Sequence, residues 1–418
     1  MNITRVRAQE VFDSRGYPTI SCLITLEDGT VVQSSVPSGS SCGEHEAFQL
    51  YDKEARCEGK GVEKAVYLIE NVIAPLLIGR EPDTALMDAI LLDLDGTEQK
   101  TKLGANTLLA VSIAVCKAQA VVYECEVFEL IAELCNAETV LLPFPLINVL
   151  NGGCHSNSGY PLQEILLVPV GAPNFKTSFE QGITAFRALN ELLKEKNKFA
   201  GIGDEGGLAA RFDSLYEPFD LIMEALKKTG LNDVFVIGID AAANQFYNKQ
   251  NKKYSIFGEE KSSEEMLQIY KKLADSYPLF SIEDGFAESD VEGWKALTAD
   301  LGKTLQIVGD DLFVTHQNKI LYGLQNGLAN SVIIKPSQIG TVTETLQAMA
   351  LAQELGANVI ISHRSGETND TFIADLAVGT SAGQVKVGGC CRGERIAKYN
   401  RLIEIEDNLT MYLLDQAE

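Results

Sequence analysis

The sequence predicts an α/β protein, with a small N-terminal α+β domain at residues 1–138 and a C-terminal (β/α)8-like barrel at residues 139–418 that carries the catalytic site. Three observations predict this architecture. The length of 418 residues accommodates one small domain and a barrel of ~250 residues. The first third of the chain changes from β-rich to helical patterning. Beyond it, short apolar segments alternate with helical ones, as in a series of β/α units.

A β-rich start followed by helices defines the predicted N-terminal domain. Residues 19–26 and 30–36 are β-rich, and Glu27-Asp28-Gly29 connects them as in a hairpin. Helical patterning then covers about residues 62–135. The prolines of Leu142-Pro143-Phe144-Pro145 predict a linker out of this domain.

In the barrel region, six apolar segments each end on a charged or imidazole-bearing residue. These residues are Asp240, Glu283, Asp310, Lys335, His363 and Lys386. Apolar segments of this kind are typical of parallel strands buried on both faces. One acid after one strand is most often a helix N-cap. Six polar residues on six strands predict instead a shared site at the carboxyl ends of the strands, where such barrels place their catalytic groups.

The residue types at these positions predict metal-assisted proton transfer. Asp240, Glu283 and Asp310 would converge as oxygen ligands, a set that suits Mg²⁺ or Mn²⁺ better than Zn²⁺. The lysines have two open roles, binding an anionic substrate or acting as a base. A lysine near a dication and a second lysine is shifted toward its neutral form, which can accept a proton. A metal combined with a lysine base can abstract a proton next to a carboxylate.

Two further segments contain candidate groups. Arg364, in His363-Arg364-Ser365-Gly366-Glu367-Thr368, can bind a phosphate through two hydrogen bonds, although an ordinary solvated loop remains the alternative. Residues 201–206 match the spacing of a dinucleotide-binding motif. However, residues 197–200 form no convincing strand, and the acids Asp204 and Glu205 would repel a pyrophosphate. A pair of acids in a glycine-rich turn suits general acid catalysis better.

Composition excludes some classes of partner and compartment. The formal charge of −23 and pI of about 4.6 argue against binding to a nucleic-acid backbone. The N-terminus resembles no signal peptide, and the apolar stretches 65–79 and 140–150 are too interrupted to span a membrane. Nine cysteines without a C-x-x-C pair indicate reduced thiols. We therefore expect a cytoplasmic protein with no nucleic-acid partner and no membrane span.

Ordered motifs along nearly the whole chain resemble the enolase family of phosphopyruvate hydratases. The motifs that carry the resemblance are Asp13-Ser14-Arg15-Gly16, Val36-Pro37-Ser38-Gly39, Leu103-Gly104-Ala105-Asn106, Asn151-Gly152-Gly153, Gly203-Asp204-Glu205-Gly206-Gly207, Ser281-Ile282-Glu283-Asp284, Gly309-Asp310-Asp311-Leu312, Gln338-Ile339-Gly340-Thr341, residues 362–368 and Glu394-Arg395-Ile396-Ala397-Lys398-Tyr399-Asn400. The resemblance implies a Mg²⁺-dependent, reversible dehydration of 2-phospho-D-glycerate to phosphoenolpyruvate in glycolysis and gluconeogenesis.

The resemblance also implies a role for each site residue. It makes Asp240, Glu283 and Asp310 ligands of a first Mg²⁺, and Ser41 a ligand of a second Mg²⁺ that enters with the substrate. It makes Lys335 the base and Glu205 the general acid, assisted by Glu164. The implied substrate contacts are His155, Gln163, Glu164, Lys335, Lys386, His363, Arg364 and Ser365, with Arg364 and Ser365 on the phosphate.

The resemblance leaves several points open. It implies a homodimer or an octamer of dimers, and by family only a surface or secreted fraction that binds plasminogen or a role in an RNA-processing complex. Gly285, Ser337 and the Cys390-Cys391 pair depart from the family pattern, so catalytic rate and sensitivity to oxidation stay open. A related phosphonate or acid-sugar substrate, or a role mainly in binding, are the alternatives.

Overall fold

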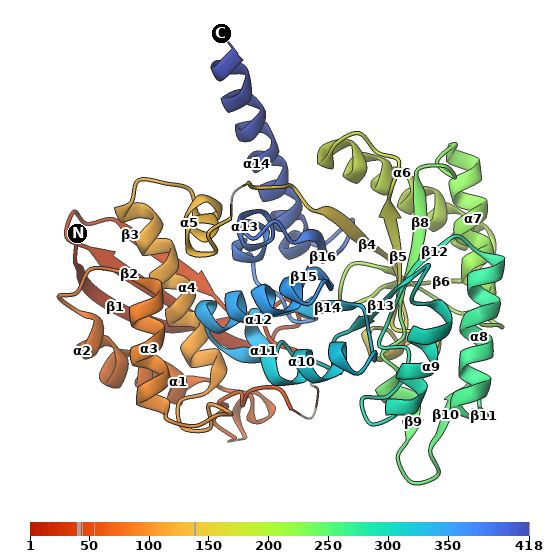
Figure 1. Cartoon of the computed structure of the whole chain (residues 1–418), viewed down its shortest axis with the longest axis horizontal. Helices are drawn as coiled ribbons and strands as arrows, with labels where there is room; N and C mark the ends of the chain where they lie inside the picture. The colour runs from red at the N-terminus through yellow and green to blue at the C-terminus, as the bar shows by residue number, and fades with distance from the viewer. Residues whose placement is uncertain (40–42, 44, 54, 138, 418) are drawn as a thin grey trace.

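The computed structural model describes residues 1–39, 43, 45–53, 55–137 and 139–417, with side chains up to residue 411. A smaller N-terminal domain lies against one side of a barrel, and the last helix projects beyond both (Figure 1). Ser41, expected to bind a second metal ion, lies outside the described residues. Residue 138, the predicted end of the N-terminal domain, also lies outside the described residues, so this domain boundary stays a prediction.

The N-terminal domain packs one antiparallel sheet against helices. Its strands are β1 (Ile3–Phe12), β2 (Pro18–Leu26) and β3 (Val31–Ser35), in the order β1-β2-β3. Its helices are α1 (Glu63–Leu68), α2 (Ala74–Leu77), α3 (Thr84–Asp95), α4 (Ala105–Val122) and α5 (Val127–Leu134), with short helical turns at Arg56–Gly59 and Ile69–Ile73. The expected hairpin and helical stretch are both present, and β1 adds a strand before them.

Helix α4 is the core of this domain. By its length and apolar composition this helix could cross a membrane. It was not among the apolar stretches considered from the sequence, which were residues 65–79 and 140–150. In the structure 83% of it is buried, against β2, β3 and α3. Its apolar composition is accounted for by burial inside the protein, because a helix that is apolar on all sides needs neighbours on all sides.

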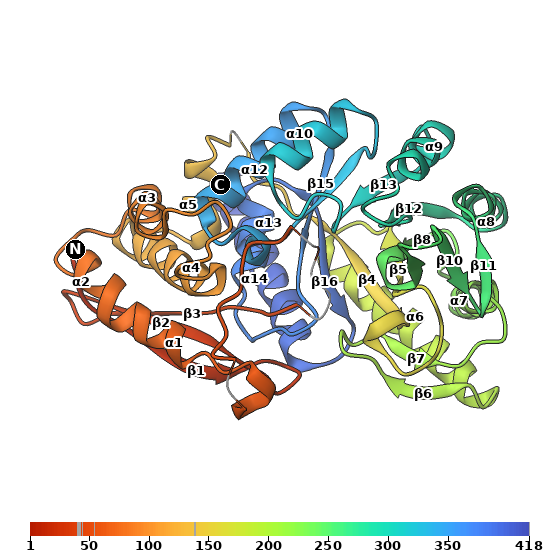
Figure 2. The same ribbon diagram turned by 90° about the horizontal axis from the view of Figure 1, so that it is seen from below.

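Eight strands close the barrel. They are β4 (Phe144–Asn151), β5 (Glu164–Pro169), β8 (Phe235–Asp240), β12 (Leu279–Glu283), β13 (Gln306–Gly309), β14 (Ser331–Ile334), β15 (Asn358–Ser362) and β16 (Gly383–Gly389), and β16 pairs with β4. The surrounding helices are α6 (Phe175–Glu195), α7 (Glu217–Thr229), α8 (Ser263–Ser276), α9 (Val291–Leu301), α10 (Gln317–Gln325), α11 (Pro336–Ile339), α12 (Val342–Glu354), α13 (Phe372–Gly379) and α14 (Gly393–Ala417). Figure 2 shows helices around much of its circumference.

One barrel strand runs against the others. The six segments identified from the sequence are parallel, as expected, but β5 is antiparallel to both of its neighbours, β4 and β8. The connection from β4 to β5 contains no crossover helix, and a parallel pairing needs one. The amino end of β5 therefore lies with the carboxyl ends of the other strands, which brings Glu164 opposite Asp240.

Two local expectations were wrong. Phe144 and Pro145, interpreted as linker, already belong to β4, where Pro145 pairs with Val385. The segment before the glycine-rich turn was expected to lack a strand, yet β6 (Phe199–Ile202) pairs with β7 (Leu208–Ala210) as an antiparallel hairpin. A second hairpin unit, β9 (Tyr247–Asn248), β10 (Lys253–Ile256) and β11 (Glu259–Lys261), follows β8.

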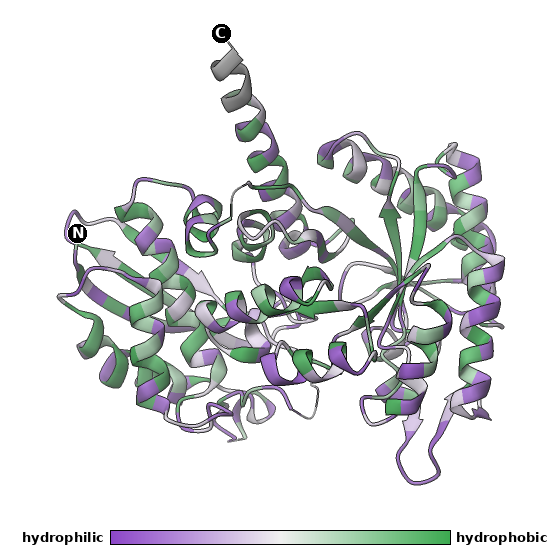
Figure 3. Cartoon of the chain, viewed as in Figure 1, coloured by the Kyte–Doolittle hydropathy of each residue, from purple (hydrophilic) through white to green (hydrophobic). Residues whose placement is uncertain are grey.

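The interior of the barrel is filled. A separate cluster of buried side chains occupies it: Leu146, Leu166, Val168, Val308, Ile333 and Ile360. Gln306 and Gln384, both buried, exchange hydrogen bonds of 2.9 and 2.7 Å. Figure 3 shows the barrel strands as largely hydrophobic. Because this packed interior blocks the barrel axis, the polar groups gather at one mouth, as in other barrels of this class.

Candidate active site

A narrow polar cavity lies at the carboxyl ends of the barrel strands. Its lining is Gly39, His155, Gln163, Glu164, Glu205, Asp240, Asp310, Lys335, Ser362, His363, Arg364, Ser365 and Lys386. All the predicted site residues are among these except Glu283 and Ser41. Glu283 is buried directly behind Lys386, and Ser41 lies outside the described residues. The folded chain thus brings the described candidates together in one place.

One wall of the cavity pairs carboxylates with lysines. Asp240 and Glu283 occupy paired positions at the ends of β8 and β12, so their side chains reach the same point. Lys386 projects from β16 between them: its Nζ donates to Asp240 Oδ2 at 2.9 Å and to the two Glu283 oxygens at 2.8 and 2.9 Å. Glu164 Oε1 lies 3.3 Å from the same ammonium. One cation therefore holds three acids.

Asp310 and Lys335 form the second ion pair of this wall. Lys335 Nζ donates to Asp310 Oδ2, and Gln338 Nε2 donates to Asp310 Oδ1 at 2.9 Å. The backbone at Asp310 is held by Asp284, whose carboxylate accepts from the Asp310 and Asp311 amides at 3.0 and 2.9 Å. Asp284 itself has a positive φ of 43°. The carboxylate at the end of β13 is therefore fixed through both its side chain and its backbone.

These pairings set the charges of the wall. Burial, reinforced by Asp240, raises the pKa of Glu283 to about 8. Burial acts to raise the pKa of Asp310 as well, but Lys335 outweighs it and the pKa is lowered. Burial acts to lower the pKa of both lysines, yet Asp310 raises that of Lys335, and Asp240 with its neighbours raises that of Lys386. Without a metal ion, both lysines are ammonium groups.

A second wall, adjacent to the first at Glu164, pairs carboxylates with imidazoles. Glu205 lies in the glycine-rich turn after β6, 3.0 Å from His155 Nδ1 and 3.7 Å from His363 Nε2. Asn148 of β4 donates to Glu205 Oε2 at 3.2 Å. Glu164 stands beside Glu205, and ligand atoms of His155, Glu164 and Glu205 lie within 4.8 Å of one another. This wall comes from loops and from the antiparallel strand β5.

The two carboxyl groups of this wall have opposite pKa shifts. Burial and the neighbouring Glu205 raise the pKa of Glu164 well above its ordinary value. Burial acts to raise the pKa of Glu205 too, but His155 and His363 outweigh it, and the pKa lies well below its ordinary value. Burial acts to lower the pKa of His155, while Glu205 raises it well above the ordinary value. The opposite shifts show that Glu164 and Glu205 share one proton, with Glu164 the more readily protonated of the two.

Gln163 joins the two walls. Its Nε2 donates to Asp240 Oδ2 at 3.1 Å, and its Oε1 accepts from Gln245. Cys154, exposed and next to His155, contacts the same amide group, with its Sγ 3.5 Å from Gln163 Oε1. The amide of Gln163 is therefore oriented by protein groups on either side.

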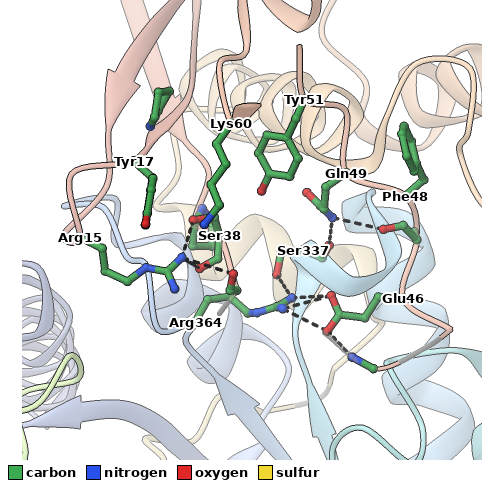
Figure 4. Close-up of a pocket in the computed structure, with 15 residues that line it drawn as sticks. Arg15, Tyr17, Ser38, Glu46, Phe48, Gln49, Tyr51, Lys60, Ser337 and Arg364 are labelled. Atoms are coloured by element: carbon green, nitrogen blue, oxygen red, sulfur yellow. Dashed lines mark hydrogen bonds and ion pairs between the residues drawn. The ribbon is translucent and has the colours of Figure 1, made fainter. Parts of the chain in front are cut away.

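A cationic loop after β15 forms the third side of the cavity. Arg364 is clamped by Glu46 of the N-terminal domain, with 3.0 Å contacts from both terminal nitrogens, and also donates to Ser337 Oγ at 3.0 Å (Figure 4). Ser365 Oγ accepts from Arg15 at 3.3 Å. A Cβ on Gly39 would lie 1.9 Å from Arg364 Nη2, so glycine is needed there. The N-terminal domain thus closes this side of the cavity.

The donor set of the cavity fits a hard divalent cation. Asp240, Glu283 and Asp310 offer only carboxylate oxygens, and the described residues that line the cavity include no cysteine. The Lys386 ammonium already stands as a cation against Asp240 and Glu283. Within the described residues, two groups have ligand atoms mutually within 4.8 Å: His155 with Glu164 and Glu205, and Asp284 with Asp310 and Asp311. Of the three predicted metal ligands, only Asp310 belongs to either group. Lys386 binds Asp240 and Glu283, whereas Lys335 binds Asp310.

Several residues that shape the cavity had no role in the sequence analysis. They are Asn148, Asp284, Glu46, Gln338, Arg15 and Arg395. Asp284 directly follows a strand-end acid, so its position was a usable signal. The others lie inside a strand, in the N-terminal domain or in a helix, where no strand-end pattern applies.

Comparisons with known proteins agree with this arrangement. A family model described as "Enolase, N-terminal domain" matches residues 3–131, and one described as "Enolase, C-terminal TIM barrel domain" matches residues 139–413. A curated protein of Mycobacteroides abscessus named "Enolase" is 46% identical over 411 residues, which cover 97% of this chain and 94% of that protein.

Proposed function

The chain belongs to the enolase family of lyases, the phosphopyruvate hydratases, and from this premise we propose that it catalyses the reversible dehydration of 2-phospho-D-glycerate to phosphoenolpyruvate. The observation that carries the proposal is that a lysine and a carboxyl pair line the same cavity. The two carboxyl groups of that pair have opposite pKa shifts, so they share a proton. Removing a proton from C2 and protonating a hydroxyl on C3 requires a base and an acid that both reach one substrate.

Asp240, Glu283 and Asp310 are the proposed holders of a first Mg²⁺, and Ser41 of a second. When bound, Mg²⁺ would stabilise negative charge on the substrate carboxylate and compete with the lysines for the carboxylates of the wall. Lys386 already balances the charge of Asp240 and Glu283. The buried carboxylates are therefore compensated before the metal arrives, which limits the cost of an apo site with several acids.

Lys335 is the proposed base for the C2 proton. Burial acts to lower the pKa of Lys335, but Asp310 outweighs it and the pKa is raised, so Lys335 paired with Asp310 is an ammonium group. Its neighbours Arg364 and Lys386 both act to lower that pKa. When Asp310 is engaged elsewhere, these two cations and burial favour the neutral amine, which can accept a proton.

Glu205 and Glu164 are proposed to act as one acid. Ligand atoms of the two residues lie within 4.8 Å of each other, so a proton held by Glu164 can pass to Glu205, the proposed donor to the C3 hydroxyl as it leaves. His155, charged and 3.0 Å from Glu205, balances the carboxylate between turnovers. This adds a detail to the expectation that Glu205 is the general acid assisted by Glu164: the opposite pKa shifts support storage of the proton on Glu164.

The remaining predicted residues bind the substrate. Arg364 and Ser365 are proposed for the phosphate, and the Glu46 carboxylate that now occupies the guanidinium must yield to it. His155, Gln163, His363 and Lys386 line the same cavity and complete the proposed contacts. The resulting set of cations explains how a protein with a formal charge of −23 can hold a phosphorylated acid.

The test is a Mg²⁺-dependent assay that follows the ultraviolet absorbance of the enol product. We expect activity on 2-phospho-D-glycerate, its loss in EDTA and its recovery on adding Mg²⁺. A panel with a phosphonate and an acid-sugar substrate distinguishes the alternatives within the superfamily. Mg²⁺ binding without turnover on any substrate would contradict the proposal and favour a role in binding.

A cytoplasmic homodimer or octamer of dimers is proposed on family membership. The eight cysteines in the described part of the chain are all unbridged, which agrees with a reducing compartment. Light scattering on the purified protein measures the assembly, and a mass equal to one chain would contradict this part of the proposal.

A further inference from the structure

Arg395 is a fully buried arginine, with 0% exposure, in the first turn of α14. Both its position in the helix and its burial are unfavourable for a positively charged side chain. A positive charge at a helix N-terminus opposes the helix dipole, and a buried guanidinium costs several kcal/mol unless its donors are satisfied. Arg395 is not among the residues proposed to bind the substrate, bind the metal or transfer a proton. Its contacts explain why an arginine occupies this place.

The guanidinium of Arg395 contacts two walls of the cavity from behind. One terminal nitrogen lies 2.6 Å from His363 Nδ1 and also donates to the Arg364 carbonyl at 2.7 Å. The other donates to the Ser365 carbonyl at 2.7 Å, and at 3.3 Å to the carbonyl of Asp204, which precedes Glu205. The same planar group therefore holds the loop proposed to bind phosphate and the turn that carries the acid.

The backbone beside the arginine is shaped to admit it. Gly388 of β16 has φ of +99°, and a Cβ there would lie 2.7 Å from Arg395 Cδ and 2.7 Å from the Glu205 carbonyl. Glycine tolerates this conformation and leaves room for the side chain. Glu394 Oε1 lies 3.3 Å from Arg395 Nε and is the nearest carboxylate partner. The arginine is thus enclosed by the protein, and its guanidinium contacts the residues of the cavity.

The contact with His363 decides where that imidazole carries its proton. A guanidinium has five donors and no acceptor, and it does not lose its charge in proteins. His363 Nδ1 must therefore be the acceptor, which leaves the ring proton on Nε2. Nε2 faces the cavity, 3.7 Å from Glu205 Oε1. Glu205 consequently meets one neutral imidazole, His363, and one charged imidazole, His155.

We propose that Arg395 is a positioning residue that fixes His363 as a neutral Nε2–H donor toward the reacting groups and anchors the Arg364-Ser365 backbone for phosphate binding. This inference rests on the proposed function for the identity of the substrate. The tautomer of His363 can be measured without any substrate. A second charge beside Glu205 would weaken its affinity for the proton it must receive from Glu164, so the neutral form matters for the reaction.

The first experiment is nuclear magnetic resonance of protein labelled with ¹⁵N-histidine, in EDTA and without substrate. The chain has four histidines, and a His363→Asn variant assigns the resonance. In the wild type we expect His363 to carry its proton on Nε2 and to stay neutral into the acid range. The charged groups that face it are Glu205, Arg395, Lys386 and Lys335. In Arg395→Met we expect a mixture of tautomers and protonation of His363 at a higher pH.

The second experiment measures kcat and KM for Arg395→Met and Arg395→Lys. We expect Arg395→Met to lower kcat/KM roughly 100-fold, because small misplacements of reacting groups have effects of that size. A lysine can donate to His363 Nδ1 but cannot also hold all three carbonyls that Arg395 contacts, so Arg395→Lys should recover part of kcat while KM stays raised. If Arg395→Met does not fold, the lysine variant and its His363 resonance decide the question.

The matched control is Arg401→Met, which removes another arginine from α14. Arg401 pairs with Asp375 at 2.6 Å and with Glu126, away from the cavity, so His363 and kcat/KM should keep their wild-type values. Equal effects of the Arg395 and Arg401 variants, or an unchanged His363 titration in Arg395→Met, would overturn the proposal. A wild-type protein without activity on 2-phospho-D-glycerate would refute the proposed function, while the His363 tautomer would still test the role of Arg395.

Discussion

The two walls of the cavity hold similar numbers of carboxylates but neutralise them differently. On the wall of β8, β12 and β13, lysine ammonium groups donate hydrogen bonds to Asp240, Glu283 and Asp310. On the wall of β5 and the glycine-rich turn, an imidazole neutralises Glu205, and Glu164 keeps a proton of its own. A lysine stays charged over the physiological range, whereas an imidazole titrates within it. The first wall therefore suits the exchange of a lysine ammonium group for a metal cation, and the second wall suits the storage of a proton.

The largest expected effect tests the lysine wall. Lys335→Met should lower kcat roughly 10²–10⁴-fold, because it removes the proposed base. The measurement is the steady-state rate in saturating Mg²⁺. The matched control is Lys100→Met, which removes a buried lysine paired with Glu344 at 2.6 Å outside the cavity and should retain activity. Turnover by Lys335→Met at the wild-type rate would refute the assignment of the base.

The next effect compares the two acids of the imidazole wall. Glu164 is already neutral, so Glu164→Gln should change the free energy of unfolding at pH 7 by less than about 1 kcal/mol. Glu205→Gln leaves buried His155 without its counter-ion and should cost about 3 kcal/mol. Both variants should lose most of their activity, since either change interrupts the proton path. Denaturant unfolding in EDTA measures the difference, and equal destabilisation by both would contradict the placement of the proton on Glu164.

A smaller effect, with opposite signs for two histidines, concerns pH. The folded pKa of His155 is raised, so its contribution to stability is complete below about pH 6.5 and is lost as pH rises through the folded value. The folded pKa of His363 is lowered, mainly by burial, so this histidine destabilises the fold as pH falls below about 6.5. Relative to wild type, His155→Gln should therefore be least stable at low pH, and His363→Gln should gain stability there.

Unfolding free energies between pH 5 and pH 8.5, measured in EDTA, test this pair. The free energy of unfolding by which wild type exceeds His155→Gln should shrink toward pH 8.5. The free energy of unfolding by which His363→Gln exceeds wild type should grow toward pH 5. Parallel curves for the two variants would show that the imidazoles do not differ in charge.

The smallest effect concerns thiols near the imidazole wall. Burial raises the pKa of Cys390 and Cys391, which keeps them as thiols and slows their oxidation. Cys154 is exposed beside His155. Mild peroxide should therefore modify Cys154 before the vicinal pair, and a partial loss of activity should be absent in Cys154→Ser. Mass spectrometry of the treated protein, with activity measured in parallel, checks the order, and earlier modification of Cys390 would contradict it.

The strand-end rule explains which parts of the site could be predicted from residues alone. Asp240, Glu283, Asp310 and Lys335 were found because each ends or directly follows a parallel strand of the barrel, and parallel strands bring their carboxyl ends together. Lys386 was expected to end its strand as well, but it lies inside β16 (Gly383–Gly389), at the level of the last residue of β15. Glu164 and His155 were not found this way. Glu164 begins the antiparallel strand β5, and His155 lies in the connection before it. Only the resemblance to a family supplied their roles.

The sequence by itself determined six parallel strands, the barrel and the lysine wall, because periodic apolar segments and the residues at their ends depend on local order along the chain. The direction of β5, the clamp of Glu46 on Arg364 and the contact of Arg395 with His363 were decided only by tertiary structure. Each of these joins residues from elements far apart in sequence, and nothing in local composition encodes such a distance. The same holds for charge: whether Lys335 is a base or an ammonium group depends on which carboxylate lies within reach of it in the folded protein.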